Sequence, residues 1–299
     1  MMDSHATSTE FRQPGHALKP HAFTLEALEQ WALEKTSQLS ADRFRLTSFW
    51  YLDYIRQDVP GERKTRYTLR LAQAENYGTA FGSVSPLRDT DHALVGDDSR
   101  AILQDRRFRD DIDRAALIDL VIGHIPAAAT HQVIVDQILR DKYALRSRLF
   151  ADEADIVLRR KGLGATKGRK PFILVIGATA GIIDALVTRG FEVKATDMCP
   201  DVVGKNLGGV TVCDATENGS LIQAADLAVI TGMTLPNRTL PALIEAAKTH
   251  NTSTMIWAIT GKNLGHYYIE QGVDCVISDP APFLQLPGPA SFGIWRREH

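Results

Sequence analysis

The sequence predicts an α/β protein in which an N-terminal α+β domain precedes a Rossmann-like, mostly parallel sheet. The chain has 299 residues, a length that favours two domains at roughly 150 residues each. Residues 161–170 are rich in glycine and lysine and lack apolar periodicity, which is typical of a linker. Short apolar runs alternate with helical segments after this stretch. We therefore expect a flexible lead at 1–21, an α+β domain at 22–165 and a Rossmann-like ligand-binding domain at 166–299.

The composition indicates a chain with enough apolar residues for a core and with a small molecule as its partner. Hydrophobic residues make up 44% of the chain and charged residues 23%, as in ordinary globular proteins. The formal net charge of -2 argues against a broad basic surface for nucleic acid or for a membrane. The most apolar stretch, residues 172–187, contains Asp184 and is shorter than the ~20 residues of a membrane-spanning helix. The oligomeric state stays open, with a homodimer among the alternatives.

The cysteines and the first residues favour a reducing cytoplasm. Cys199, Cys213 and Cys275 lie far apart and form no C-x-x-C pair, so the sequence suggests neither a disulfide framework nor a cysteine zinc site. Residues 1–5 lack the basic and then apolar order of a secretory signal. We expect a cytoplasmic protein.

The first domain combines helices with an antiparallel pair of strands. Thr24 is placed to cap a helix that begins at Leu25 and has apolar residues at helical spacing. Residues 65–71 alternate between two faces, and a second extended run follows at 77–84, so we expect these runs to pair. Apolar residues at helical spacing predict two further helices, at residues 114–125 and 130–150.

The second domain alternates short apolar runs with helical segments, which predicts parallel strands in a doubly wound sheet. Each run has the length of a buried strand. The six predicted strands cover residues 172–176, 193–196, 210–213, 227–231, 255–258 and 275–277. Ligands of such sheets bind at the carboxyl ends of the strands.

The turn after the first of these strands is a candidate ligand cradle. Small residues allow a ligand to approach the backbone, and the start of the following helix at 182–189 favours an anionic or oxygen-rich group. The candidate binding residues in this turn are Gly177, Thr179, Ala180 and Gly181. The spacing is Gly-x-x-x-Gly rather than the dinucleotide fingerprint G-x-G-x-x-G, so a packing turn in a domain without a ligand stays an alternative.

Two acidic residues at strand ends favour a ligand that contains adenosine. Asp197 follows Gly177 by 20 residues and lies where a carboxylate accepts hydrogen bonds from ribose hydroxyls. Asp214 ends the third strand in the same way. We expect S-adenosylmethionine as substrate or cosubstrate. Thr231 and Thr234, in the polar turn after the fourth strand, are further candidate ligand contacts, although capping of the next helix explains Thr234 equally well.

Three segments carry a resemblance to a known family. Residues 231–234 read Thr-Gly-Met-Thr, residues 237–240 read Asn-Arg-Thr-Leu, and residues 279–282 read Asp-Pro-Ala-Pro. They resemble the heavy-metal-chelation family, mainly over residues 172–283. This resemblance implies an enolase-N-terminal-like domain joined to a Rossmann-like domain, with the site in the cleft between them.

The sequence itself supplies little for a metal. His92 with Asp89 and Asp91 forms the best local cluster, but a solvated loop explains these residues better. His124 and His131 lie apart from it. We therefore assign no metal ligands and rank metal chelation as the second function.

A motif that is absent from the sequence argues against methyl transfer to an amine. Amine methyltransferases of the Rossmann type often end the fourth strand with Asp/Asn-Pro-Pro-Tyr/Phe, whereas residues 234–237 read Thr-Leu-Pro-Asn. Cleavage on the aminocarboxypropyl side of S-adenosylmethionine is then a candidate reaction, in which the ligand's own amine closes a four-membered ring and methylthioadenosine leaves. This reaction would resemble that of azetidine-2-carboxylate synthases.

The candidate catalytic residues are Asn237, Tyr54 and Tyr77. Asn237 or a tyrosine hydroxyl would accept the ammonium proton. Tyr51 and Tyr54 are the aromatic candidates for the sulfonium, and Tyr77 is a further candidate for the wall of the cleft. We expect a transferase or lyase. A small-molecule methyltransferase, a metal-handling protein and a binding domain without chemistry are the alternatives.

Overall fold

The structure is a computed structural model of the chain. It describes residues 22–56, 65–83, 94–108, 110–126, 131–137, 139–163, 169–279 and 288–298. The predicted lead at 1–21 and the cluster of Asp89, Asp91 and His92 lie outside these residues.

The N-terminal unit begins with the predicted capped helix. Helix α1 (Leu25–Thr36) starts after Thr24, whose hydroxyl accepts a hydrogen bond from the Ala27 backbone N–H at 3.1 Å. Leu28 and Ala32 lie on its buried face. The prediction of this helix and of its cap is confirmed.

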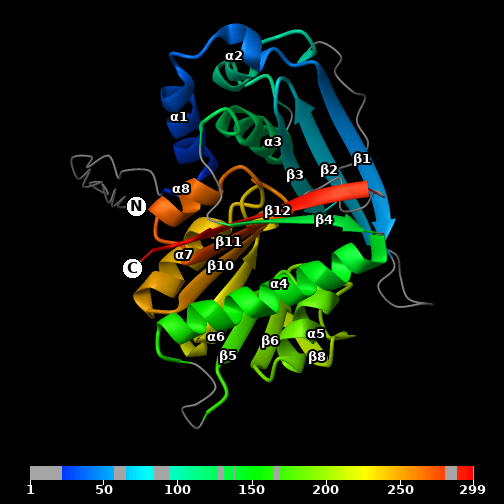
Figure 1. The fold of residues 1–299 in the computed structure, drawn as a ribbon, viewed down its shortest axis with the longest axis vertical. Coiled ribbons are helices and arrows are strands. Elements are labelled where there is room, and N and C mark those ends of the chain that lie inside the picture. The colour runs from blue at the N-terminus through cyan, green and yellow to red at the C-terminus, as the bar shows by residue number, and fades with distance from the viewer. Residues whose placement is uncertain are drawn as a thin grey trace, which may run out of the picture.

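A three-stranded antiparallel sheet, in the order β1-β2-β3, lies against the helices of this unit (Figure 1). The predicted pair is confirmed as β2 (Thr65–Gln73) and β3 (Tyr77–Ser83), and β1 (Ser48–Arg56) adds a third strand. The helices are η1 (Ala41–Phe44), α2 (Ser99–Gln104) and α3 (Asp111–Ile122). Helix α3 lies directly on β3 because Gly78 has no side chain, and a Cβ there would collide with the backbone of Leu120.

The C-terminal part is built around a larger sheet. In the part of the chain that the structure describes, this sheet has nine strands in the order β4-β12-β11-β10-β9-β5-β6-β8-β7. The six predicted strands are confirmed as β5 (Phe172–Ile176), β6 (Glu192–Asp197), β8 (Val210–Asp214), β9 (Leu227–Thr231), β10 (Ser253–Ala258) and β11 (Cys275–Ser278). These six are parallel to one another. Numbered along the chain, they follow the Rossmann order 3-2-1-4-5-6.

Three further strands are antiparallel additions at the two edges. They are β12 (Gly288–Arg296), which pairs with β11, β4 (His131–Gln137), which pairs with β12, and β7 (Asn206–Leu207), which pairs with β8. The helices of this part are α4 (Leu139–Arg160), α5 (Ala180–Thr188), η3 (Ala215–Glu217), α6 (Asn218–Ala224), η4 (Gly232–Thr234), α7 (Leu240–Thr249) and α8 (Gly265–Glu270).

The predicted helix over residues 130–150 is wrong at its start, because residues 131–137 form strand β4. The β-branched run of residues 133–135 favours an extended chain, and β12 offers it a pairing edge. Helix α4 then packs on α5 and on the large sheet. Both β4 and α4 thus belong to the layers of the large sheet, although they precede the predicted boundary at residue 166.

Each face of the large sheet has its own core, because successive side chains of a strand point to opposite faces. On β5, Phe172, Leu174 and Ile176 belong to a cluster that includes α6, α7, α8 and the N-terminal helices. Ile173 and Val175 belong to a second cluster, under α4 and α5. The first cluster is continuous with the core of the N-terminal unit, so one apolar core joins the two parts.

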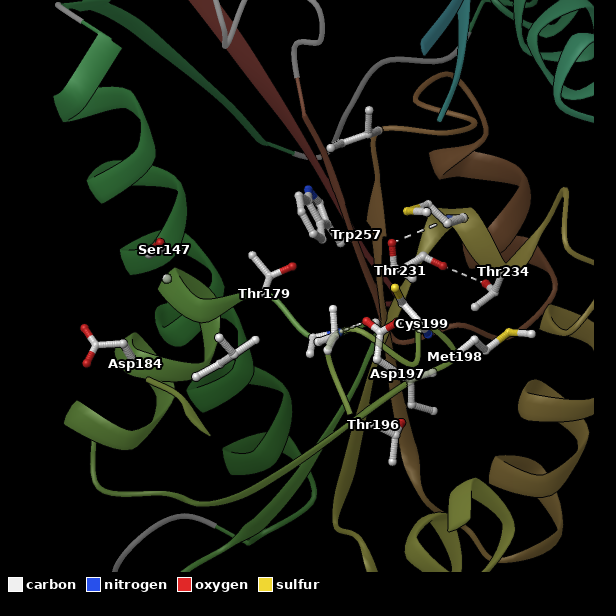
Figure 2. A pocket seen from close by; sticks show the side chains of 18 of the residues that line it. Ser147, Thr179, Asp184, Thr196, Asp197, Met198, Cys199, Thr231, Thr234 and Trp257 are labelled. Atoms are coloured by element: carbon white, nitrogen blue, oxygen red, sulfur yellow. Dashed lines mark hydrogen bonds between the residues drawn. The ribbon is translucent and has the colours of Figure 1, made fainter. Parts of the chain in front are cut away.

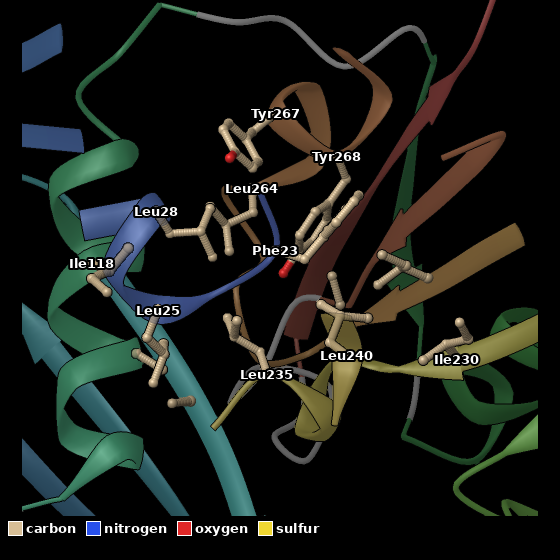
Figure 3. Close-up of a cluster of buried hydrophobic side chains, with 14 of the residues drawn as sticks. Phe23, Leu25, Leu28, Ile118, Ile230, Leu235, Leu240, Leu264, Tyr267 and Tyr268 are labelled. Carbon is tan, nitrogen blue, oxygen red and sulfur yellow. The ribbon is translucent and has the colours of Figure 1, made fainter. Parts of the chain in front are cut away.

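The N-terminal unit and the C-terminal part meet at a joint between α1, α3 and β3 on one side and α8 with the loop after β10 on the other. This joint contains both stacked rings and buried polar groups. Phe23 stacks on Tyr268 with ring centroids 5.9 Å apart (Figure 3). Asp119 of α3 is fully buried and accepts hydrogen bonds from the backbone N–H groups of Thr79 at 2.8 Å and of Asn263 at 2.7 Å. The Asp119 carboxylate thereby links α3 and β3 to the loop that follows β10.

Burial disfavours the charges of both ionisable groups at this joint. It raises the pKa of Asp119 and lowers the pKa of Lys262, and the charge of each residue opposes the shift of the other. The Lys262 ammonium lies 3.0 Å from the centre of the Tyr77 ring. The pair is therefore held by mutual attraction and by the aromatic face.

No helix among the described residues is both long enough and apolar enough to cross a bilayer.

Asp119→Ala should lower the free energy of unfolding by about 3–5 kcal/mol, because it leaves a buried lysine and two buried N–H groups without their partner. Urea denaturation measures this change. Asp42→Ala is the control, since that side chain is 85% exposed, and it should change the stability by less than about 0.5 kcal/mol. Similar losses in the two variants would contradict the role given to Asp119.

Candidate functional site

A cavity of about 1590 Å³ opens at the carboxyl edge of the large sheet. The residues at or just beyond the ends of five neighbouring parallel strands line it, together with helices α4 and α5 and Tyr67 of β2. Figure 2 shows Thr179, Asp197, Thr231 and Trp257 around this space. Open α/β sheets bind ligands at this edge, at the point where the strand order reverses. In this sheet the reversal lies between β5 and β9.

The glycine turn after β5 lies at that reversal. Gly177 has a φ of +89°, and its N–H donates to the carbonyl of Thr196 at 2.9 Å. A Cβ at Gly177 would be 2.9 Å from the Cβ of Thr231 and even closer to its methyl group, so only glycine lets the turn lie against the end of β9. Gly177, Thr179 and Gly181 all line the cavity. Ala180, the fourth predicted residue of the turn, begins α5 and is not among the lining residues.

Asp197 lies at the centre of the edge, where it connects two turns. Its Oδ2 accepts from the Ala178 N–H at 2.9 Å, and its Oδ1 accepts from the Cys199 N–H at 2.8 Å. Burial raises the pKa of Asp197, although these amides and that of Met198 favour the charged form and oppose the shift. A carboxylate has about four acceptor positions. At least one therefore stays available toward the cavity.

Asp214 also lines the cavity, directly beside Asp197 in the register of β6 and β8. It is exposed and accepts hydrogen bonds from the N–H of Thr216 at 2.8 Å and from its hydroxyl at 2.6 Å. These bonds lower the pKa of Asp214, so it is ionised at neutral pH. The edge thus carries two neighbouring carboxyl groups, as the sequence predicts.

The turn after β9 brings Thr231, Thr234 and Asn237 to the same cavity. The Thr234 hydroxyl donates to the carbonyl of Thr231 at 2.6 Å, which fixes the turn. The side-chain oxygen of Asn237 accepts from the N–H and the hydroxyl of Thr239, at 3.1 and 2.7 Å. Its amide nitrogen lies 3.5 Å from the sulfur of Met198. Asn237 therefore faces the cavity as a donor.

The predicted tyrosines are placed differently from one another. Tyr77 contacts Lys262 at the joint, and Tyr51 lies under the Arg70 guanidinium, 4.4 Å from its ring centre. Neither is among the residues that line the cavity. Tyr54 is part of β1, opposite Tyr67, but its side chain lies outside the described residues. Tyr67 lines the cavity instead, and the sequence contained no signal for it beyond the alternation of β2.

Four further residues that the sequence did not single out also line the cavity. Trp257 of β10 and Arg146 of α4 line the cavity, as do Met198 and Met233. Trp257 lay within a predicted strand, so its position near the carboxyl end was the available signal. Arg146 had none, because its place depends on how α4 crosses the sheet.

Residues 164–258 match the DUF364 family. The description of this family is "Putative heavy-metal chelation". No curated protein matches the chain.

Two crystal structures of DUF364 proteins of unknown function, from Pyrococcus horikoshii and Desulfitobacterium hafniense, are similar over most of the chain. Each has a TM-score of 0.50 and 12% sequence identity, and each comparison covers 91% of this chain. The shares of those chains that are covered are 99% and 98%. This likeness shows the fold, an antiparallel sheet with helices followed by a mostly parallel sheet.

The described residues do not fit a heavy-metal site. Within these residues, no group of three or more histidine, cysteine, aspartate or glutamate side chains is placed to hold a metal ion. Thiolates are the form in which cysteines bind metals, and burial raises the pKa of Cys275 well above its usual value. His124 is buried against the ring of Phe44, with centroids 4.6 Å apart. We derive no chemistry through a metal.

Gly177→Ala should cost more stability than the positive φ alone explains. A non-glycine residue in this region costs roughly 1–2 kcal/mol, and the clash with Thr231 should add at least about 1 kcal/mol. Gly190→Ala is the matched control, because Gly190 has a φ of +95° with nothing within 4 Å of its Cβ position. Adding Thr231→Ser to Gly177→Ala should recover part of the loss. Equal unfolding free energies for the two alanine variants would contradict the close contact.

Proposed function

We propose that this protein binds S-adenosylmethionine in the cavity and cleaves its aminocarboxypropyl side, forming azetidine-2-carboxylate and methylthioadenosine. The observation that carries the proposal is the meeting of the Gly177 turn, Asp197 and Asp214 at the reversal point of a sheet with the order 3-2-1-4-5-6. Nucleoside ligands of Rossmann sheets place the ribose at such an acidic residue. The remaining acceptor position of Asp197 suits a ribose hydroxyl.

The walls of the cavity suit a sulfonium. Trp257, Tyr67, Met198 and Met233 line it, and a cation over an aromatic face gains about 0.5–2 kcal/mol. Trp257 is only 8% exposed and its ring already lies against the Arg146 guanidinium, so the aromatic face proposed for the sulfonium is that of Tyr67. Desolvation strengthens this attraction.

The proposed reaction needs no second substrate. The neutral α-amine attacks the γ-carbon, the new N–C bond forms as the γ-carbon–sulfur bond breaks, and the electron pair of that bond passes to sulfur. The sulfonium becomes the neutral thioether of methylthioadenosine, and the ring nitrogen becomes an ammonium that keeps both of its hydrogens. The one proton released in the reaction goes to water beforehand, when the α-ammonium becomes the attacking amine. Positioning and exclusion of solvent around the reacting atoms are the contributions of the protein.

The turn after β9 supports this reaction over methyl transfer to an amine. It lacks the Asp/Asn-Pro-Pro-Tyr/Phe motif, and Thr239 already occupies the Asn237 oxygen that would accept from an amine. In our proposal Asn237 orients the ligand through its amide N–H groups. Tyr77 does not contact the ligand in this proposal, because its ring lies against Lys262 at the joint between the two parts of the protein. The tyrosine that the cavity offers to the ligand is Tyr67.

Asp197→Ala should weaken the binding of S-adenosylmethionine roughly 10- to 100-fold, the effect of losing a hydrogen bond to a charged group. Isothermal titration calorimetry measures the dissociation constant. Asp42→Ala, on the exposed surface, should leave it unchanged. Because Asp197 also holds two turns, the thermal midpoint of the variant should be measured beside the wild type. An unchanged dissociation constant would remove Asp197 from the site.

The purified protein, given S-adenosylmethionine alone, should release methylthioadenosine and azetidine-2-carboxylate in equal amounts. The amino-acid product must be separated chromatographically against standards, because homoserine lactone is an isomer of the same mass and forms when S-adenosylmethionine decomposes. Heat-inactivated protein is therefore the control. S-adenosylhomocysteine as product would favour a methyltransferase, and tight metal binding without turnover would favour chelation. Either result would overturn the proposed reaction.

A further inference from the structure

We propose that Arg146 binds the carboxylate of the ligand's amino-acid end and thereby selects ligands that carry it. This inference rests on the proposed function, which it deepens by naming the residue that recognises one end of S-adenosylmethionine. Arg146 projects from α4 and lines the cavity. It is only 5% exposed.

Two aromatic rings hold the guanidinium in place. Its central carbon lies 5.0 Å from the centre of the Tyr143 ring and 4.9 Å from the centre of the Trp257 ring. Trp257 in turn donates from its ring N–H to Oδ2 of Asp279 at 3.2 Å. Asp279 is a positioning residue, because it fixes both the arginine and the tryptophan that line the cavity.

The ion pair of Arg146 is unusually loose for a buried arginine. Its Nη1 lies 3.6 Å from Oδ2 of Asp279. By comparison, the buried Arg114 lies 2.6 and 2.7 Å from two glutamates, and the buried Arg70 lies 3.0 Å from Asp113. Within the described part of the chain, neither Nε of Arg146 nor Oδ1 of Asp279 has a hydrogen-bond partner. Arg146 lines the cavity whereas Asp279 does not. Because an unpaired buried group is costly, the geometry points to a ligand that completes the hydrogen bonds of the guanidinium.

The start of α5 lies beside Arg146. Ser147, the next residue of α4, has its hydroxyl 2.9 Å from the Cβ position of Gly181 in the first turn of α5. Ser147, Thr179 and Trp257 lie along the same part of the cavity in Figure 2. Thr179 precedes α5 without capping it through its side chain, so its hydroxyl is available to a ligand. A carboxylate here would meet both the guanidinium and the free N–H groups of a helix start.

The charge of the pair indicates an amino acid rather than a phosphate. Arg146 and Asp279 together carry no net charge, whereas phosphate sites need an excess of positive charge. Burial raises the pKa of Asp279, but Arg146 and Trp257 favour its charged form. An α-amino acid carries both charges on adjacent groups. Its carboxylate can bind Arg146, and its ammonium stays in the field of Asp279 until it loses the proton that frees the amine for the attack.

The test compares S-adenosylmethionine with decarboxylated S-adenosylmethionine, which keeps the sulfonium and the amine and lacks only the carboxylate. Calorimetry should show that the wild type prefers S-adenosylmethionine. Arg146→Met should weaken the binding of S-adenosylmethionine by roughly 10- to 100-fold and change the binding of the decarboxylated ligand much less. Arg146→Lys should retain part of the preference, because it keeps the charge and loses the planar fork.

Arg159→Met is the matched control, since Arg159 lies on the same helix, is 71% exposed and is not among the residues that line the cavity; it should keep the preference. Methylthioadenosine, which lacks the whole amino-acid end, should bind Arg146→Met as it binds the wild type, which shows that the variant has folded with an intact nucleoside site. A preference that survives Arg146→Met, or that disappears in Arg159→Met, would overturn the assignment. If none of the three ligands binds the wild type, the proposed function fails, and the assignment fails with it.

Discussion

The buried carboxylate of Asp119 is the interaction on which the arrangement of the two parts depends. It pairs backbone N–H groups from β3 and from the loop after β10, two segments far apart in the sequence. The same loop supplies Ile259 and Thr260 to the wall of the cavity, and the Ile259 carbonyl accepts from the hydroxyl of Thr79 at 2.6 Å. The N-terminal unit thus helps to shape the cavity even though most of the residues that line it belong to the large sheet and its helices.

The parallel strands β5, β9, β10 and β11 could be predicted because each is buried on both faces, which leaves a nearly continuous apolar run in the sequence. β6 and β8 are only partly buried, and their apolar runs are shorter or interrupted. β5 and β9 coincide with the predicted ranges. The antiparallel edge strands have no such signal. Residues 131–137 contain apolar positions compatible with a helix, and only pairing with β12, which is distant in sequence, makes them a strand. That partner is invisible in a local pattern.

The residues of the site also fall into those that the sequence could predict and those that it could not. Gly177, Asp197 and Asp214 could be predicted because a residue just beyond a parallel strand lies at the carboxyl edge wherever the strand stands in the sheet. Arg146 and Tyr67 could not, because their positions depend on the packing of α4 and of the small sheet. The aromatic residues also show this limit. Tyr77 lies between Asn76 and Gly78, in a context that suits a cavity residue, but its ring lies against Lys262 instead.

The pairing of β4 with β12 has a consequence for how the chain reaches its native state. Gln137 lies opposite Gly288, about 150 residues later, and such distant contacts form late and slow the folding rate. During synthesis β4 leaves the ribosome long before its partner exists, and helix α4 is joined to it. Helix α4, which carries Arg146 into the cavity wall, is therefore joined to a strand, β4, that stays unpaired until β12 has been made.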